Sequence, residues 1–291
     1  MRSLVSALHR TGGRSIPLPD RFPSLAKEGI RFRRQQVTMI AGQPGSGKSL
    51  LALDYAIHAN VNTLYFSADS DGDTVLNRVG AMKLDTEVVQ VEDMREQASI
   101  GLLEDELATL TNVRFCFDPS PTLEVIDLEL RAWNEVYGEQ PDLIIIDNLI
   151  NIQSENQADE WGSLRDLCKT MHEIARSTGA AVIVLHHTSE QSGTGGPNLP
   201  QPRAALQGKL SALPELILTI AIDPSINKFF VSAVKNRSGK ADALARNYIS
   251  LDVNLSKMEL KEVPVAPPPP PISVRRAWDE INNDFNNEDV K

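Results

Sequence analysis

The hydrophobic pattern divides most of the chain into short apolar runs and longer segments in which apolar residues recur with helical spacing. Short runs rich in apolar residues predict buried strands, because a parallel sheet covered on both faces needs apolar side chains on both sides of each strand. Alternation of such strands with amphipathic helices is typical of an α/β fold with a mostly parallel central sheet flanked by helices. The predicted strands cover residues 36–41, 63–67, 113–117, 143–146 and 181–185, and the predicted helices cover 50–56, 123–136 and 158–175.

Three more apolar runs follow, at 216–222, 229–234 and 248–253, and they are joined by turns. Parallel strands need a long crossover connection, whereas antiparallel strands need only a turn. The sheet is therefore predicted to become antiparallel toward its C-terminal edge.

The domain organisation follows from the same pattern. We expect an N-terminal lead-in over 1–24, one folded domain over 25–262, and a C-terminal segment over 263–291. The C-terminal segment combines a proline run with an acidic end. It is predicted to be a linker and a disordered tail, through which loader or replication partners could bind.

Composition and charge limit the class of protein. The chain has 291 residues and a net charge of −10, and no apolar run reaches the length of a membrane span. Cys116 and Cys168 are far apart and lack metal-ligand spacing, which fits reduced thiols in a cytoplasmic protein. The acidic balance argues against a broad basic surface for nucleic acid, but it is compatible with positive groups confined to a narrow channel.

The most informative motif lies between the first predicted strand and the first predicted helix. The run Gly42-Gln43-Pro44-Gly45-Ser46-Gly47-Lys48-Ser49 matches the P-loop pattern. A glycine-rich turn at a helix N-terminus directs backbone N–H groups toward phosphate oxygens. Lys48 is expected to reach the outer phosphates and Ser49 to hold Mg²⁺, so the motif predicts binding of a nucleoside triphosphate.

Acidic residues follow two other predicted strands. Asp147 follows the run 143–146, where a carboxylate could hold the water shell of Mg²⁺. Asp69 follows the second strand and could orient the attacking water, because ligands of open parallel sheets gather at the carboxyl ends of strands. Asp71 and Asp73 come soon afterwards, so the choice among three carboxylates stays open at this point.

Histidines and basic residues follow two later strands. His186 and His187 are adjacent and therefore face opposite sides of a strand, which argues against chelation by the pair; one of them could contact a γ-phosphate. Lys235 and Arg237 follow the run 229–234 and project to one side. They form either an exposed basic turn or, if they lie far from their own P-loop, a pair that completes the site of a neighbouring subunit.

These features in this order resemble the RecA-type P-loop ATPase core, and most of all the ring-forming DnaB-type helicases and their compact plasmid RepA relatives. The resemblance spans residues 25–255 and includes the Leu185-His186-His187-Thr188-Ser189 segment and the Lys-Xaa-Arg-Xaa-Gly turn at 235–239. It implies that Asp69 is the catalytic carboxylate, that His187 senses phosphate, and that Lys235 and Arg237 act in trans. It also implies an ATP contact set of Gly42, Gln43, Pro44, Gly45, Ser46, Gly47, Lys48, Ser49 and Leu50, with Ser49 and Asp147 at Mg²⁺.

The resemblance further implies an ATP-dependent helicase or translocase that acts on single-stranded DNA in replication as a ring, expected to be a hexamer. The segments that would face DNA in such a ring are 148–159 and 188–203. The first has no Lys or Arg and the second has only Arg203, so salt should affect DNA binding weakly. Two alternatives stay open: a RadA-like recombination ATPase that remodels branched DNA, and a nucleotide-switched assembly or loading protein with a slow ATPase.

Overall fold

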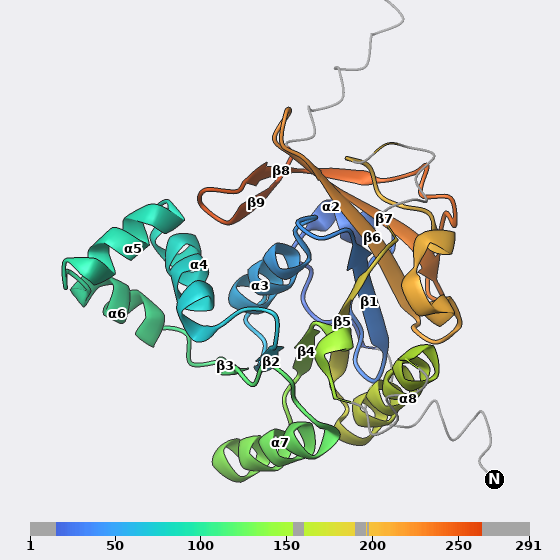
Figure 1. Cartoon of the computed structure of the whole chain (residues 1–291), viewed down its shortest axis with the longest axis horizontal. Helices are drawn as coiled ribbons and strands as arrows, with labels where there is room; N and C mark the ends of the chain where they lie inside the picture. Colours follow the sequence, from blue (N-terminus) through green and yellow to red (C-terminus); the bar gives the residue numbers. More distant parts are fainter. Residues whose placement is uncertain (1–15, 154–159, 190–195, 197, 264–291) are drawn as a thin grey trace, which may run out of the picture.

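The centre of the protein is one large sheet (Figure 1). In the computed structural model, which describes residues 16–153, 160–189, 196 and 198–263, nine strands pair in the order β3-β2-β4-β5-β1-β6-β7-β8-β9. The first six of these positions are parallel, and β7, β8 and β9 are antiparallel. This arrangement confirms the predicted α/β fold and its antiparallel C-terminal edge. The strands are β1 (Val37–Gly42), β2 (Thr63–Ser67), β3 (Val113–Cys116), β4 (Leu143–Asp147), β5 (Ala181–His187), β6 (Leu216–Asp223), β7 (Lys228–Asn236), β8 (Ile249–Asn254) and β9 (Glu259–Glu262).

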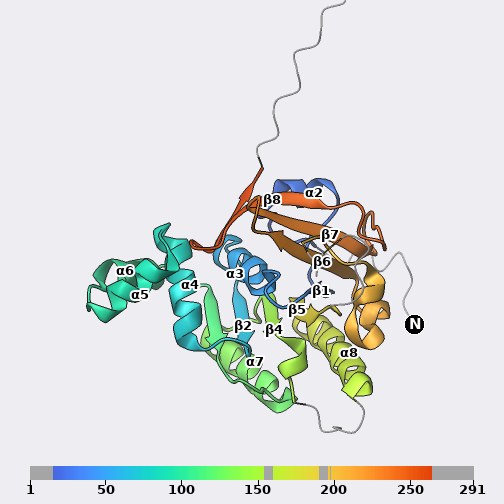
Figure 2. The same cartoon turned by 45° about the horizontal axis from the view of Figure 1, so that its top comes forward.

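Helices cover both faces of the sheet. In Figure 2, α3 lies on one side of the central strands, and α7 and α8 lie on the other. The α-helices are α2 (Pro23–Lys27), α3 (Lys48–His58), α4 (Gly72–Leu84), α5 (Val88–Glu96), α6 (Gly101–Ala108), α7 (Leu123–Tyr137) and α8 (Glu160–Thr178). Short 3₁₀ turns are η1 (Leu149–Asn151), η2 (Arg203–Ala205) and η3 (Gln207–Ala212).

The alternation of side chains along each strand creates two cores. On β4, Leu143 and Ile145 pack into the core beneath α3, whereas Ile144 and Ile146 pack into the core beneath α7 and α8. Because side chains alternate with period two, Asp147 continues the row of Leu143 and Ile145. The same rule places the side chain of the last residue of each strand parallel to β1 on a defined face at the edge where the P-loop lies.

Three features go beyond the sequence prediction. Helices α4, α5 and α6 connect β2 to β3 in the sequence and form a unit that extends away from the sheet (Figure 1). This unit encloses a small core of Ala81, Val91 and Leu103. The strand β9 carries three charged residues in four and has no apolar run that would indicate a strand. Packing of the core also begins before residue 25, because Leu18 and Phe22 are buried in the core beneath α3.

Two further expectations relate to the ends of the chain and to membranes. The predicted C-terminal tail lies outside the described residues, apart from position 263. Within the part of the chain that the structure describes, no helix has the length and apolar character needed to cross a bilayer.

Candidate functional site

The P-loop joins the C-terminal end of β1 to the first residue of α3. Two of its glycines are required by close packing. A Cβ atom at Gly42 would overlap the Ser46 hydroxyl, and one at Gly47 would stand 2.7 Å from the ring of Phe229. Gly47 also has a φ of 84°, in the left-handed region that other residues rarely adopt. The turn is therefore held in one tight shape, and the N-terminus of the 11-residue helix α3 opens at its end.

The side chain of Lys48 is folded back over this turn. Its Nζ donates to the backbone carbonyls of Gly42, at 3.1 Å, and Gln43, at 3.0 Å. Burial lowers the pKa of Lys48, and the negative charges of Asp147 and Asp69 oppose that shift. The ammonium group thus lies where the charges of the two predicted catalytic acids act on it.

The carboxylate of Asp147 is almost fully enclosed, with 3% of the residue exposed. The hydroxyl of Tyr65 donates to its Oδ2 at 2.8 Å, and the Ser49 side chain is also hydrogen-bonded to it. Burial raises the pKa of Asp147, and these two hydrogen bonds act in the opposite direction. The acid and the P-loop serine predicted as Mg²⁺ ligands are therefore in direct contact.

The end of β2 is attached to the end of β4 at this point. The amides of Ala68 and Asp69 donate to the carbonyl of Asp147, at 2.7 Å and 3.2 Å. Asp69 is exposed, whereas Asp147 is buried, so the two acids have different surroundings although their backbones touch. The structure brings Asp69 to the site, whereas Asp71 accepts a hydrogen bond from the amide of Thr74 and caps α4.

The two histidines at the end of β5 face opposite sides. Nδ1 of His187 lies 3.5 Å from Lys48 Nζ, and its Nε2 lies 2.7 Å from Nδ2 of Asn148. Nε2 of His186 instead contacts the carbonyl of Gln207 at 3.1 Å, and burial lowers the pKa of His186 to about 4. Only His187 faces the P-loop.

Lys235 and Arg237 lie at the opposite end of the sheet. In the antiparallel pair of β6 and β7, Lys235 is opposite Ile217, and the start of β6 lies beside the start of β1. The chain from Thr38 to Gly42 spans roughly 13 Å, so these side chains are far from their own P-loop. Lys235 donates to the carbonyls of Ser211 and Ala212, both at 2.8 Å, and Arg237 lies 3.5 Å from a carboxylate oxygen of Glu215.

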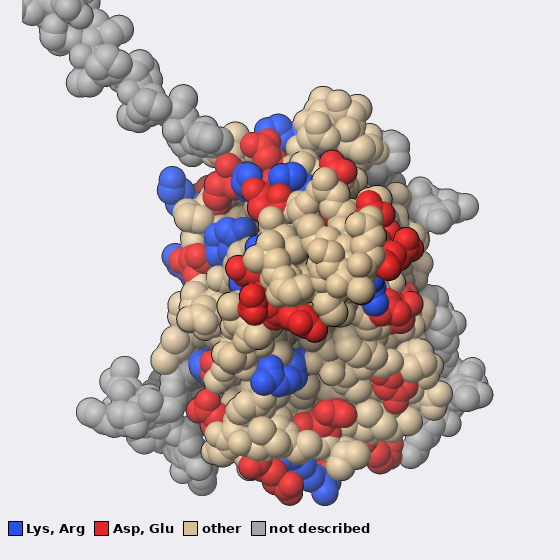
Figure 3. All heavy atoms as spheres, turned by 90° about the vertical axis from the view of Figure 1, so that its left-hand side faces the viewer, with Lys and Arg blue, Asp and Glu red and all other residues tan. Residues whose placement is uncertain are grey.

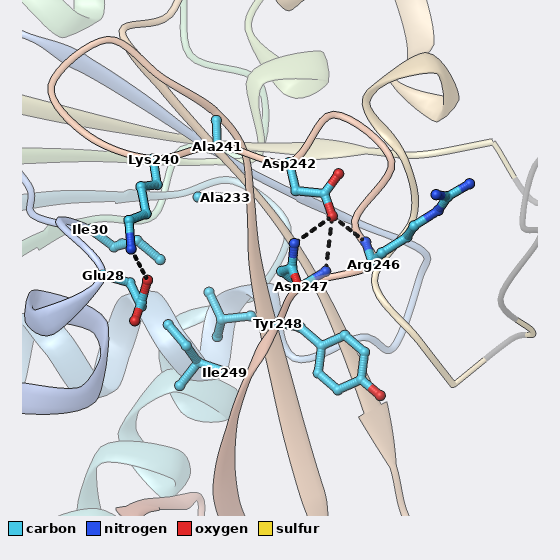
Figure 4. A pocket seen from close by; sticks show the side chains of 11 residues that line it. Glu28, Ile30, Ala233, Lys240, Ala241, Asp242, Arg246, Asn247, Tyr248 and Ile249 are labelled. Atoms are coloured by element: carbon cyan, nitrogen blue, oxygen red, sulfur yellow. Dashed lines mark hydrogen bonds and ion pairs between the residues drawn. The ribbon is translucent and has the colours of Figure 1, made fainter.

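Two cavities differ in their relation to this site. One of about 290 Å³ adjoins the P-loop and is lined by Gln43, Pro44, the strand β6 and Leu255. Another of about 750 Å³ lies between α2 and the strands β7 and β8 (Figure 4). There Lys240 points toward Glu28, and Asp242 accepts hydrogen bonds from neighbouring backbone amides. We place the candidate site at the smaller cavity because it adjoins the P-loop.

Comparison with known proteins shows the family of the chain. A family model described as an AAA domain, AAA_25, matches residues 18–193, which is more than half of the chain. The chain belongs to the AAA_25 family. Its P-loop and Asp147 both fall within the matched residues.

Individual relatives of this AAA_25 protein fall into two groups. The Gene 65 protein of Mycobacterium phage L5 is 32% identical over 88% of this chain and 97% of its own length. The replicative DNA helicase DnaB of Geobacillus stearothermophilus is 23% identical over 64% of this chain and 42% of its own length. Among solved structures, a DnaB-like replicative helicase superposes with a TM-score of 0.75 at 16% identity, covering 90% of this chain and 66% of that one. The core is thus a RecA-type P-loop ATPase fold of the kind found in helicases.

The residues of the AAA_25 site fit Mg²⁺ bound together with a nucleotide. Among the described residues, no three His, Cys, Asp or Glu side chains gather as a metal site. Mg²⁺ is commonly held by one or two protein oxygens together with substrate phosphates. The Ser49 hydroxyl and the Asp147 carboxylate supply such a pair, and the buried hydroxyl of Ser46 in the same P-loop has no hydrogen-bond partner in the described part of the chain.

Two residues of the AAA_25 site were not predicted. Tyr65 lies in the middle of an apolar strand, where an aromatic residue is indistinguishable from any other core residue. Tyr65 lies two residues before Ser67, so their side chains share one face of β2, and Ser67 pairs with Asp147 on the neighbouring strand. This spacing predicts a contact between Tyr65 and Asp147 only when the strand order is known. Asn148 follows Asp147 directly and gave no pattern of its own.

Proposed function

We propose that this protein is a Mg²⁺-dependent ATPase that assembles into a ring, expected to be a hexamer, and moves along single-stranded DNA during replication. The observation that carries the proposal is the separation of the two halves of the site. The P-loop, Asp147 and Asp69 lie at one end of the sheet, while Lys235 and Arg237 lie at the other. If Lys235 and Arg237 stabilise the transition state, they must do so at the P-loop of an adjoining subunit.

The chemistry at each subunit interface follows from the residues described above. The backbone N–H groups of residues 43 and 45–50 would hold the phosphates, since Pro44 has none, and Lys48 would leave the carbonyls of Gly42 and Gln43 to contact the outer phosphates. Mg²⁺ held by Ser49 and Asp147 would neutralise developing charge. Asp69 is exposed at the edge of the site and would orient the attacking water.

The nucleoside would occupy the cavity of about 290 Å³ beside the P-loop, whose lining includes Ile220 and Ile222 of β6. An apolar floor next to a phosphate-binding turn suits the flat face of a base. Replacement of Lys48 by Ala tests the site: ATP hydrolysis should fall to background. Hydrolysis at the parent rate would show that the P-loop assignment is wrong.

A mixing experiment tests the shared site. Arg237→Ala and Asp69→Ala subunits should each be inactive alone. Arg237→Ala lacks the cation that acts on the neighbouring subunit's site, and Asp69→Ala lacks the acid that orients the attacking water. A mixture contains interfaces at which an intact Asp69 meets an intact Arg237, so ATPase activity should return. Failure of every mixing ratio to restore activity, with mixed rings confirmed by native mass spectrometry, would contradict action in trans.

The DNA part of the proposal is supported by the relatives named as replicative DNA helicases. The face shown in Figure 3 carries Lys and Arg interspersed with Asp and Glu and has no continuous basic area, so DNA contact is expected elsewhere, inside the ring. Single-stranded oligonucleotides should stimulate the ATPase several-fold in the wild-type protein. A rate independent of DNA would favour a nucleotide-switched assembly protein, and stimulation restricted to branched DNA would favour a recombination ATPase.

A further inference from the structure

The side chain of Asn148 has an unusual hydrogen-bond environment. The residue is 1% exposed, follows Asp147 directly and begins the turn η1, where its carbonyl accepts from the amide of Asn151 at 3.1 Å. Its Nδ2 lies 2.7 Å from His187 Nε2. Its Oδ1 is buried and has no hydrogen-bond partner within the described residues. A buried polar atom without a partner is costly and points to a function.

The ring of His187 lies between two donors. Lys48 Nζ, which carries only hydrogens to donate, lies 3.5 Å from Nδ1, and the Nδ2 group of Asn148 faces Nε2. Burial lowers the pKa of His187, so the ring is neutral at pH 7 and has a single lone pair. One lone pair cannot serve two donors, so one of the two contacts is unsatisfied in this arrangement.

Two changes satisfy the ring. If Lys48 stays, Nδ1 accepts a hydrogen bond from its ammonium group, Nε2 carries the ring hydrogen, and the carboxamide of Asn148 must turn to offer Oδ1. If a phosphate oxygen faces Nδ1 in place of Lys48, Nδ1 carries the hydrogen, and Nε2 accepts from Nδ2 as the carboxamide now stands. As it stands, the carboxamide directs its donor Nδ2 at Nε2, so it favours the second case, in which Nδ1 carries the hydrogen and faces a phosphate.

We propose that Asn148 is a positioning residue that sets the tautomer of His187 and so makes the site prefer a nucleoside triphosphate over a diphosphate. This inference rests on the proposed role of His187 beside the γ-phosphate. It also couples binding of that phosphate to the segment after β4, because Asn148 precedes η1 directly. A side chain without hydrogen-bonding groups at position 148 would no longer favour one tautomer of His187, and it would remove the coupling between the phosphate and η1.

The test compares the affinity for ADP with the affinity for a non-hydrolysable ATP analogue by calorimetry, without DNA. Asn148→Leu should weaken binding of the analogue roughly tenfold, which is the effect of losing one hydrogen bond to a charged group. It should change ADP binding less than twofold, because ADP has no γ-phosphate, and this arm also shows that the variant is folded. Asn151→Ala, in the same turn, is the matched control and should keep the wild-type preference.

A double-mutant cycle separates this inference from the role of His187. His187→Ala should lose the same preference, and Asn148→Leu should add nothing in that background, because the two residues act as one unit. Additive losses, equal weakening of both nucleotides by Asn148→Leu, or an unchanged preference in Asn148→Leu would each overturn the inference. An unchanged preference in His187→Ala would instead refute the proposed role of His187. If Asn148→Leu does not fold, Asn148→Ala replaces it in both arms.

Discussion

Removal of the Tyr65 hydroxyl tests how the buried acid is held. Tyr65→Phe deletes the donor that lies 2.8 Å from Oδ2 of Asp147 and leaves the ring in the core beneath α3. The carboxylate keeps its contact with Ser49 but loses its fully buried partner. Because Asp147 is 3% exposed, water has little access to replace the missing hydrogen bond.

The expected cost follows from the charge of the acceptor. A hydrogen bond to a charged group contributes about 1.5–3 kcal/mol, whereas one to a neutral group contributes about 0.5–1.5 kcal/mol. A matched control exists in Tyr55, whose hydroxyl donates at 2.9 Å to the neutral carbonyl of Pro19. We therefore expect Tyr65→Phe to lower the free energy of unfolding by about 2 kcal/mol and Tyr55→Phe by about 1 kcal/mol.

The two variants should also differ in their dependence on pH. Burial already raises the pKa of Asp147, so the folded protein favours the protonated acid and loses stability as the pH rises from the unfolded value of that acid through the folded one. Loss of the Tyr65 donor raises this pKa further. The cost of Tyr65→Phe should therefore be full at pH 8 and shrink as the pH falls, while the cost of Tyr55→Phe stays constant.

The assay is urea unfolding followed by circular dichroism in Mg²⁺-free buffer, at several pH values from 8 downward. Equal costs for the two variants at pH 8, or a cost of Tyr65→Phe that does not change with pH, would refute the view that the hydroxyl supports an ionised buried carboxylate.

Three other predictions concern packing, charge and pH. In thermal melts, Gly47→Ala should destabilise the protein by more than the roughly 1–2 kcal/mol that an alanine in the left-handed region costs, because its Cβ would stand 2.7 Å from Phe229. Gly45→Ala is the control: Gly45 has a φ of 75° and nothing lies within 4 Å of the position that its Cβ would take, so this variant should show the backbone cost alone. Arg21→Ala should lower the free energy of unfolding by about 3 kcal/mol in urea, because Arg21 donates at 2.8 Å to Asp54, which is 1% exposed. Arg31→Ala, at the exposed pair with Asp20, should have a much smaller effect because water screens that pair. Burial lowers the pKa of His186 from 6.5 to about 4, so the folded protein favours the neutral ring. The stability that depends on neutral His186 should be complete above pH 6.5 and decline by up to about 3 kcal/mol as the pH falls toward 4. His186→Asn should make the free energy of unfolding less dependent on pH in this range, and an unchanged slope would contradict this role of His186.

Much of the fold was accessible from the sequence because its signals are local. Eight strands fall where apolar runs predicted them, and the P-loop glycines sit at the turn that their spacing indicated. The α4–α6 unit was not predicted because its helices are short and weakly amphipathic, and they pack mainly on each other around Val91 and Leu103. The strand β9 was missed because backbone pairing with β8, rather than an apolar pattern, fixes it.

The candidate site divides in the same way. The P-loop residues were predicted from their motif, and Asp147 was predicted from its place at the end of an apolar strand, so the sequence alone was enough for both. The contacts of Tyr65 and Asn148 depend on strand order, since β2, β4 and β5 are neighbours in the sheet, although the segment from α4 to α7 separates β2 from β4 in sequence and α8 separates β4 from β5. No spacing along a single chain records which strands become neighbours.

Topology also explains why the proposed site has to be shared between subunits. If the strand carrying Lys235 ran parallel to β1, its C-terminal end would lie at the P-loop edge with Asp69, Asp147 and His187. The β6–β7 hairpin reverses the chain and brings Lys235 and Arg237 to the start of β6 instead. Under the proposed function, the direction of one strand, more than the identity of its residues, prevents a lone subunit from completing its own site. Reversal of charge at Arg237 should therefore abolish hydrolysis while leaving the affinity of an isolated subunit for ADP unchanged, and weakened ADP binding in that subunit would contradict this account.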